Sequence, residues 1–185
     1  YKELGFIPVR ACSLVFGILV HETIEDIHKA AIKNELDKIT KDNIESWFNS
    51  NYEAISKSEH SYLGEMQLQA ALNQVLRYVE RQNDDWHLIQ QAEVDVSLVE
   101  PDYIIGGKID LIKGENDTVE IVDFKSEKKP DMFKSSELLE QYRRQLHLYA
   151  YLVEERTGHK VSKMHLYYTG EDSGVPTISY SYTKT

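Results

Sequence analysis

The chain has 185 residues, of which 41% are hydrophobic and 28% are charged, and these values are ordinary for a globular protein. Residues 1–185 are enough to form a single domain with a substantial core. Acidic residues outnumber basic ones by 31 to 21, so the net charge is −10, which argues weakly against nucleic acid as a partner, although a locally basic surface can override this average. No apolar run approaches the roughly 20 residues of a membrane span, so no membrane partner is expected.

The start of the chain and its cysteine content indicate its setting. The sequence begins at Tyr1 without a Met or a basic leader, which is typical of a fragment of a larger protein and not of a signal peptide. Cys12 is the single cysteine, which excludes an internal disulfide or a four-cysteine metal cluster built by this chain. A reducing, cytoplasmic location is therefore expected.

The first part of the chain, residues 1–86, is predicted to be mainly helical. After a leading loop over residues 1–10, apolar residues recur at helical spacing. The predicted segments are a helix from residue 12 or 13 to about 36, a helix over 42–52, a loop over 56–61 and a helix over 62–82.

The second part, residues 87–185, is predicted to form the sheet together with one long helix. Alternation of apolar and polar residues over 92–99 predicts a half-buried strand. The later predicted elements are strands over 105–112 and 118–125, a helix from 135 or 136 to about 157, and strands over 160–169 and 177–182. This order predicts an α/β or α+β domain with a mixed sheet.

The two strands over 105–112 and 118–125 contain the most informative residues. They are joined by a predicted turn over 113–117, and each places an Asp, Asp110 or Asp123, in an apolar setting. Burying a carboxylate is costly unless it is paired, hydrogen-bonded or bound to a metal. Antiparallel pairing would bring the two carboxylates side by side at one end of the sheet.

Asp123 and Lys125 are two residues apart, so their side chains project to the same face of a strand. Mg²⁺ and Mn²⁺ prefer oxygen ligands, and a lysine beside such an ion could orient a water or offset negative charge. Phe124 would point to the other face and leave its backbone carbonyl free as a further ligand. Because Asp-x-Lys is common, exposed carboxylates beside a surface lysine are the alternative.

Four segments resemble one family. Residues 107–112, Gly-Lys-Ile-Asp-Leu-Ile, followed by 119–126, Val-Glu-Ile-Val-Asp-Phe-Lys-Ser, resemble the core of the PD-(D/E)XK nuclease superfamily. Residues 17–21 resemble its Gly-x-x-x-His helix, and residues 145–149 resemble its Gln-Leu-x-x-Tyr helix. The order of the segments is that of the RecB-like branch, found fused to UvrD/Rep-type helicases and in AddB-like and CRISPR-associated exonucleases.

The resemblance implies a restriction-endonuclease-like fold, with a central mixed sheet flanked by helices and an N-terminal helical segment. It also implies roles for individual residues. The implied ligands of Mg²⁺ or Mn²⁺ are His21, Asp110, Asp123 and the backbone carbonyl of Phe124. The implied catalytic residues are Asp110, Asp123 and Lys125, while Gln145 and Tyr149 would border the site and touch DNA. No iron–sulfur cluster is expected, because the four cysteines that some members use for it are absent.

Several other residues have two open interpretations. Glu93 resembles a glutamate found in RecB-like sequences before the Gly-x-x-Asp segment, but Asp95 is a competing candidate and both could be solvated. Residues 125–144 contain six basic and four acidic residues, and these could contact phosphate or simply form a solvated helix face and loop. The candidates for phosphate contact are Lys128, Lys129, Arg143 and Arg144, with Lys134. Tyrosines that could stack on bases, but are more often core residues, are Tyr149, Tyr151, Tyr167 and Tyr168.

The predicted function is that of a metal-dependent DNA nuclease, an exonuclease that works with a DNA helicase in repair or recombination. Its substrate would be single-stranded DNA or duplex ends. One alternative is a nuclease-derived module that binds DNA or a protein without cutting. Another is an unrelated α/β domain, in which His21 would lie far from Asp110.

Overall fold

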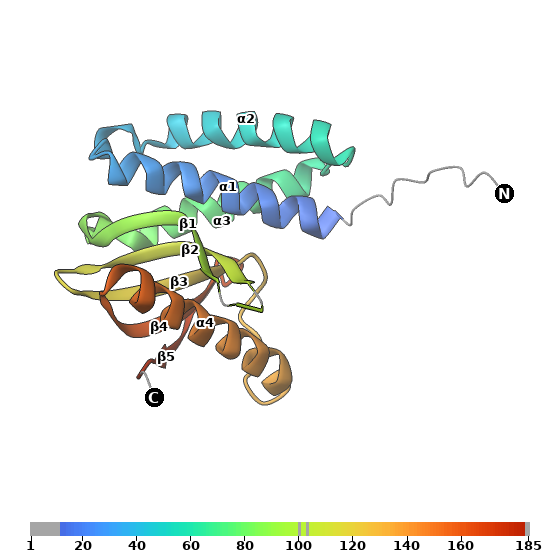
Figure 1. The fold of residues 1–185 in the computed structure, drawn as a ribbon. Coiled ribbons are helices and arrows are strands. Elements are labelled where there is room, and N and C mark those ends of the chain that lie inside the picture. The colour runs from blue at the N-terminus through green and yellow to red at the C-terminus, as the bar shows by residue number, and fades with distance from the viewer. Residues whose placement is uncertain (1–11, 100, 103, 184–185) are drawn as a thin grey trace.

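Helix α1 (Cys12–Ile32) lies at the centre of a helical layer that covers one face of a β-sheet (Figure 1). Its inner side carries five residues that are at most 2% exposed: Val15, Leu19, Val20, Ile24 and Ile27. Their helical spacing places them on one side of α1. This side packs against the neighbouring helices and the first strand, so the sheet fixes the position of α1.

The computed structural model describes residues 12–99, 101–102 and 104–183, and the predicted leading loop over 1–10 lies outside them. The remaining helices are α2 (Lys41–Glu59), α3 (Glu65–Gln82) and α4 (Ser136–Thr157), with short 3₁₀ turns at Leu36–Lys38 and Asp85–Leu88. The strands are β1 (Ile89–Val99), β2 (Ile104–Glu115), β3 (Thr118–Lys125), β4 (Lys160–Tyr168) and β5 (Thr177–Ser181). None of the helices in these described segments has the length and apolar character of a membrane span.

Two helix ends differ from the prediction. Helix α1 stops at Ile32 and not near residue 36, and Asn34 turns the chain with a positive φ of 58°. Helix α2 continues to Glu59, so the predicted loop over 56–61 is wrong. Burial of Ile55 in the core that α2 shares with α1 keeps this polar stretch helical.

The other helix boundaries lie close to the predicted ones. Helix α3 begins at Glu65 and not at residue 62, because Gly64 donates its N–H to Gln67 Oε1 at 3.0 Å and forms the helix start. Helix α4 ends at Thr157 as predicted. Gly158 follows with a φ of 74°, a backbone conformation that glycine adopts easily at a helix end.

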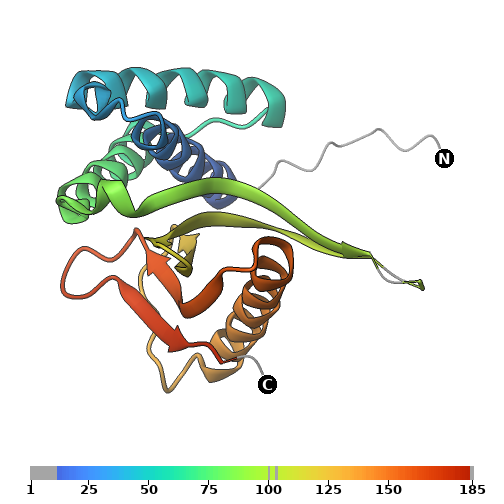
Figure 2. The ribbon, with the colours of Figure 1, turned by 60° about the vertical axis from the view of Figure 1, so that its left-hand side comes forward.

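The sheet is mixed, and its strand order follows the chain order from β1 to β5. All neighbouring strands are antiparallel except β3 and β4, which are parallel. Parallel neighbours need a crossover connection, and α4 provides it on the face opposite to α1 (Figures 1 and 2). The predicted mixed sheet flanked by helices, with an N-terminal helical segment, is therefore confirmed.

A separate apolar core fills each face of the sheet. Leu111, Val122 and Phe124 pack toward α1, α2 and α3. Ile112 and Ile121 pack toward α4. Alternate residues of the central strands thus enter different cores, as expected for strands buried on both faces.

The turn between β2 and β3 is shorter than predicted. Lys113, Gly114 and Glu115 belong to β2 and pair with β3, so the predicted turn over 113–117 is wrong. Only Asn116 and Asp117 connect the strands, and Asn116 has a φ of 55°. Asn and Asp tolerate this left-handed conformation, which permits a two-residue hairpin connection.

Strands β2 and β3 separate at Asp110. Their pairing reaches Leu111 and Val122, whereas β1 and β2 remain paired as far as Val99 and Ile104. The β1–β2 hairpin therefore extends beyond the rest of the sheet (Figure 2). A fork between two strands is thus present beside Asp110.

Candidate active site

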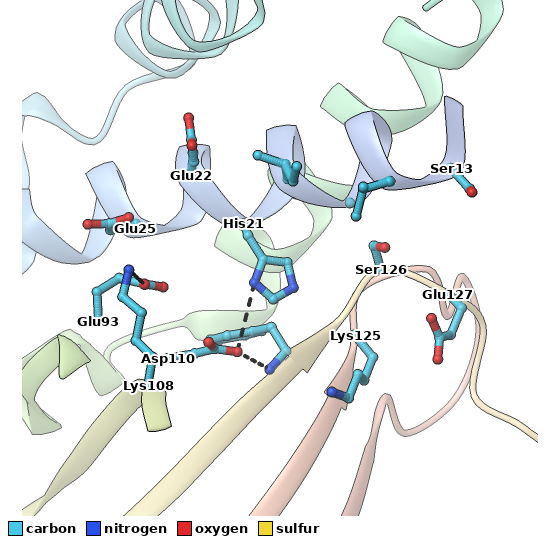
Figure 3. A pocket seen from close by; sticks show the side chains of 14 residues that line it. Ser13, His21, Glu22, Glu25, Glu93, Lys108, Asp110, Lys125, Ser126 and Glu127 are labelled. Carbon is cyan, nitrogen blue, oxygen red and sulfur yellow. Dashed lines mark hydrogen bonds and ion pairs between the residues drawn. The ribbon is translucent and has the colours of Figure 1, made fainter. Parts of the chain in front are cut away.

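Helix α1 brings His21 to the fork between β2 and β3. One turn before His21, Gly17 lies so close to the end of β3 that an added Cβ atom would be 3.1 Å from Ser126 Oγ. His21 Nδ1 lies 3.8 Å from Asp110 Oδ2 (Figure 3). One alternative was an unrelated α/β domain, in which His21 would lie far from Asp110. The short distance between the two side chains contradicts this alternative.

Asp110 lies next to Asp123 across the hairpin, because the adjacent positions Leu111 and Val122 are paired. Its Oδ2 atom accepts a hydrogen bond of 2.7 Å from the backbone N–H of Phe124. Burial, and secondly the charge of Asp123, raise the pKa of Asp110 to about 7. Because both groups are largely buried, the carboxylates of Asp110 and Asp123 repel one another unless a proton or a cation lies between them.

Asp123 and Lys125 share one face of β3, as predicted. Lys125 Nζ lies 2.7 Å from Asp123 Oδ2, and Asp123 is only 8% exposed. Burial acts to lower the pKa of Lys125, but the charge and hydrogen bond of Asp123 outweigh it, so the pKa lies above its usual value. Lys125 is therefore protonated near neutral pH.

His21 is in the form that can bind a metal. Burial lowers its pKa, and the charges of Asp123 and Glu93 only partly oppose this effect. A neutral imidazole is the state that coordinates metal ions.

The four implied ligands offer one imidazole nitrogen and three oxygen donors, a set that suits Mn²⁺ and is acceptable for Mg²⁺. Asp123 Oδ2 is buried and is paired with the ammonium group of Lys125 at 2.7 Å, so this oxygen would have to be shared with a bound cation or released to it. Within the described residues, no three His, Cys, Asp or Glu side chains already stand together as a metal-binding group. His21 and Asp110 converge, whereas the carboxylate of Asp123 is turned to Lys125. The donor chemistry fits a divalent cation.

A cavity of about 670 Å³ opens between α1 and the ends of the central strands. His21, Asp110 and Lys125 line it, together with the Phe124 position. Its other end is acidic, with Glu22, Glu25 and Glu93 in its wall (Figure 3). The cavity thus joins residues from α1, β1, β2 and β3 at one surface.

The geometry favours Glu93 over Asp95. Glu93 lies between two residues that pair with Leu111 and Ile109, which places it across from Asp110. It lines the cavity and forms an ion pair with Lys108. Its φ of 52° interrupts the predicted alternation of β1. Asp95 is exposed and does not line this cavity.

Gln145 and Tyr149 connect α4 to β2. Gln145 Nε2 donates to Tyr149 Oη at 2.7 Å, and Tyr149 is only 7% exposed. Gly107 lies against the tyrosine ring, since an added Cβ atom would be 2.9 Å from Tyr149 Oη. Neither side chain lines the cavity, so their proposed contact with DNA gains no support. Tyr149 and the fully buried Tyr168 are not exposed for base stacking, while Tyr151 and Tyr167 are half-buried.

Four of the candidate phosphate-binding residues, Lys128, Lys129, Arg143 and Arg144, have side-chain partners within the chain. Lys128 forms an ion pair of 2.9 Å with Asp172, and Lys129 donates to the Val175 carbonyl at 2.6 Å. Both lysines thereby tie the β3–α4 loop to the β4–β5 loop. Arg143 binds both carboxylate oxygens of Glu140 at 2.8 Å, and Arg144 lies 3.5 Å from the same group. Phosphate contact by these four residues remains a prediction that requires these pairs to open.

Sequence reasoning missed two groups of residues beside Lys125. Gln74 donates to the Ser126 carbonyl at 3.1 Å and accepts from Thr169 Oγ1 at 2.9 Å. These partners lie 52 and 95 positions away, so no local pattern could have indicated them. The ring of Tyr142 lies against Lys125. Its position on the same stripe of α4 as Gln145 was an available signal.

The mixed sheet, the N-terminal helix and the carboxylates at the fork define a PD-(D/E)XK nuclease-like fold. Residues 4–180 match the sequence model of the PD-(D/E)XK nuclease superfamily, and the chain belongs to this superfamily. The fold is similar to the crystal structure, at 2.19 Å resolution, of a protein from Eubacterium rectale described as a candidate exonuclease. The TM-score is 0.54 at 13% identity, over 90% of this chain and 59% of the other. No curated protein sequence matches the chain.

Proposed function

We propose that this chain is a metal-dependent DNA nuclease domain that hydrolyses phosphodiester bonds. The observation that supports this proposal best is the convergence of His21, Asp110 and Lys125, from three separate elements, on one cavity. Membership of the nuclease superfamily supports the same reaction.

His21, Asp110, Asp123 and the Phe124 carbonyl would hold Mg²⁺ or Mn²⁺. Such an ion, when bound, polarises the scissile phosphate and lowers the pKa of an attacking water. Asp110 gives up its proton to become a ligand, which its pKa of about 7 makes easy near neutral pH. Lys125, protonated beside Asp123, orients the water or offsets the negative charge that develops on the phosphate.

The proposal extends to the setting of the reaction. The RecB-like motifs support an exonuclease of single-stranded DNA or duplex ends, with a DNA helicase on the same or a companion chain, in repair or recombination. Residues 1–185 would be one nuclease domain of a larger cytoplasmic protein. This chain spans 59% of the length of the comparison structure.

The test is cleavage of end-labelled linear DNA, single-stranded and duplex, with Mg²⁺, with Mn²⁺ and with a chelator. Lys125→Ala and Asp123→Asn should each lower the rate on the order of 100-fold or more, because each removes a charge next to the reacting phosphate. Lys57→Ala is the control, since Lys57 is paired with Glu53 on the outer helix α2. Cleavage that persists in both site variants, or in the presence of the chelator, would contradict the proposal.

The non-cutting module is separated from the nuclease by titration calorimetry with Mn²⁺ alone. If the chain is a nuclease, Mn²⁺ should bind to the wild type, and the substitution Asp110→Ala should abolish this binding. No binding at millimolar metal would support the inert module. Circular single-stranded DNA distinguishes an exonuclease from an endonuclease, because an exonuclease needs a free end and leaves the circle intact.

A further inference from the structure

The ammonium group of Lys125 is held between two partners. On one side lies the carboxylate of Asp123, at 2.7 Å. On the other lies the ring of Tyr142, whose centroid is 4.3 Å from Lys125 Nζ. Tyr142 belongs to α4, on the face of the sheet opposite to α1, so a second helix reaches the candidate site from behind.

The position of Tyr142 suits the fixing of a lysine. A lysine side chain carries about 2 kcal/mol of rotamer entropy, so one ion pair leaves its ammonium several positions. A cation within about 6 Å of an aromatic centroid is attracted to the ring face, and the attraction strengthens when both groups are shielded from water. The Lys125 side chain is only 18% exposed.

We propose that Tyr142 is a positioning residue for Lys125, whose ring face keeps the ammonium beside Asp123 and directed at the reacting phosphate. The role in catalysis depends on the proposed nuclease function. Tyr142, Gln145 and Tyr149 lie along one stripe of α4. The stripe then fixes both strands at the fork, with Tyr149 against Gly107 of β2 and Tyr142 against Lys125 of β3.

The kinetic test compares Tyr142→Phe with Tyr142→Leu on linear single-stranded DNA. Phenylalanine keeps the ring, so kcat and KM should stay within about twofold of the wild type. Leucine removes the ring face and should lower kcat on the order of tenfold, with KM nearly unchanged. The control is Tyr180→Leu, because Tyr180 is also a half-buried tyrosine in the α4-side core. Equal kcat values for the Phe and Leu variants would overturn the proposal.

A second readout does not depend on cleavage. With lysines labelled at Cε, the Lys125 resonance is identified by its loss in Lys125→Arg. The aromatic ring should shift this resonance away from those of exposed lysines. The shift should persist in Tyr142→Phe and disappear in Tyr142→Leu, while thermal unfolding verifies that both variants are folded.

The two readouts separate the two claims. A wild-type chain that does not cleave DNA would overturn the proposed function and, with it, the catalytic consequence of the contact. A Lys125 resonance that does not change in Tyr142→Leu would overturn the positioning contact itself, whatever the chain cleaves.

Discussion

Two histidines of α1, one at the cavity and one in the core, differ in their surroundings although they are two turns apart. His21 lines the cavity and faces Asp110. His28 is 1% exposed, and its Nε2 atom is 2.7 Å from the hydroxyl of Tyr78. Its ring also lies 5.6 Å from that of Phe124. Burial lowers the pKa of His28 to about 3.

His28 should make stability depend on pH. In the folded chain it stays neutral down to about pH 3, whereas in the unfolded chain it takes up a proton below its ordinary pKa of 6.5. The free energy of unfolding should therefore fall as the pH drops from 6.5 toward 3, by up to about 1.4 kcal/mol per pH unit from this group. Urea unfolding between pH 8 and pH 4 measures this slope.

Replacement of His28 should reduce that slope by the contribution of one proton. His28→Phe loses the contact with the Tyr78 hydroxyl, so it should be less stable than the wild type at pH 8 but show a flatter pH dependence. His87→Gln is the control, because His87 is 64% exposed. An unchanged slope in His28→Phe would mean that His28 is not the group responsible.

At the scale of elements, the end of β3 is fixed by residues distant in sequence. Thr169, just after β4, donates its N–H to the Lys125 carbonyl at 2.8 Å. Its hydroxyl donates to Gln74 Oε1, and the same amide of Gln74 donates to the Ser126 carbonyl. The backbone at Lys125 is therefore held by the neighbouring strand β4 within the sheet and by helix α3 on the face that α1 covers.

Loss of this bridge should affect both stability and rate. Thr169→Val keeps the shape but removes the hydroxyl, leaving Gln74 Oε1 without its donor in a half-buried place. The expected cost is about 1–3 kcal/mol in the free energy of unfolding, with a lower kcat at an unchanged metal affinity. Thr169→Ser should restore most of both, as measured by urea unfolding and steady-state cleavage.

The matched control for this bridge is Gln69→Ala. The Gln69 amide is on the same helix but donates to Asn73, on the exposed side of α3. If Thr169→Val and Gln69→Ala behave alike, the bridge has no special role at Lys125.

Local patterns predicted the elements that depend on neighbouring residues. The spacing of Val15 and Leu19 indicated part of the buried side of α1, and the period of two placed Asp123 and Lys125 on one face. The length of α2 could not be predicted from local patterns, because the segment around Ile55 is polar and its helix is stabilised by burial of Ile55 in the core shared with α1. The pairing of Tyr142 with Lys125 depends on how α4 crosses the sheet, which no sequence window contains.

At the scale of the molecule, the two cores share one sheet. Leu19 lies in the core of the α1 face and Leu146 in the core of the α4 face. Trp47 and Trp86 both pack against the first core. Since β3 contributes residues to both cores, we expect the described residues to unfold as one unit.

Cavities in the two cores test this expectation. Leu19→Ala and Leu146→Ala should each lower the free energy of unfolding by about 2–5 kcal/mol. Tryptophan fluorescence and circular dichroism should give coincident transitions in both variants. A fluorescence midpoint that stays at the wild-type value in Leu146→Ala would show that the helical layer unfolds independently, and that the single-domain assignment is wrong.

The fork at Asp110 also has a consequence for the order in which a nascent chain gains activity. Helix α1 leaves the ribosome early, but His21 meets Asp110 only after the β2–β3 hairpin has been made. Lys125 meets Tyr142 still later, once α4 has been synthesised and has crossed the sheet. The proposed site is thus built almost entirely from contacts distant in sequence, which form late in folding. A truncated or half-synthesised chain would carry most of the motif and yet lack the assembled site.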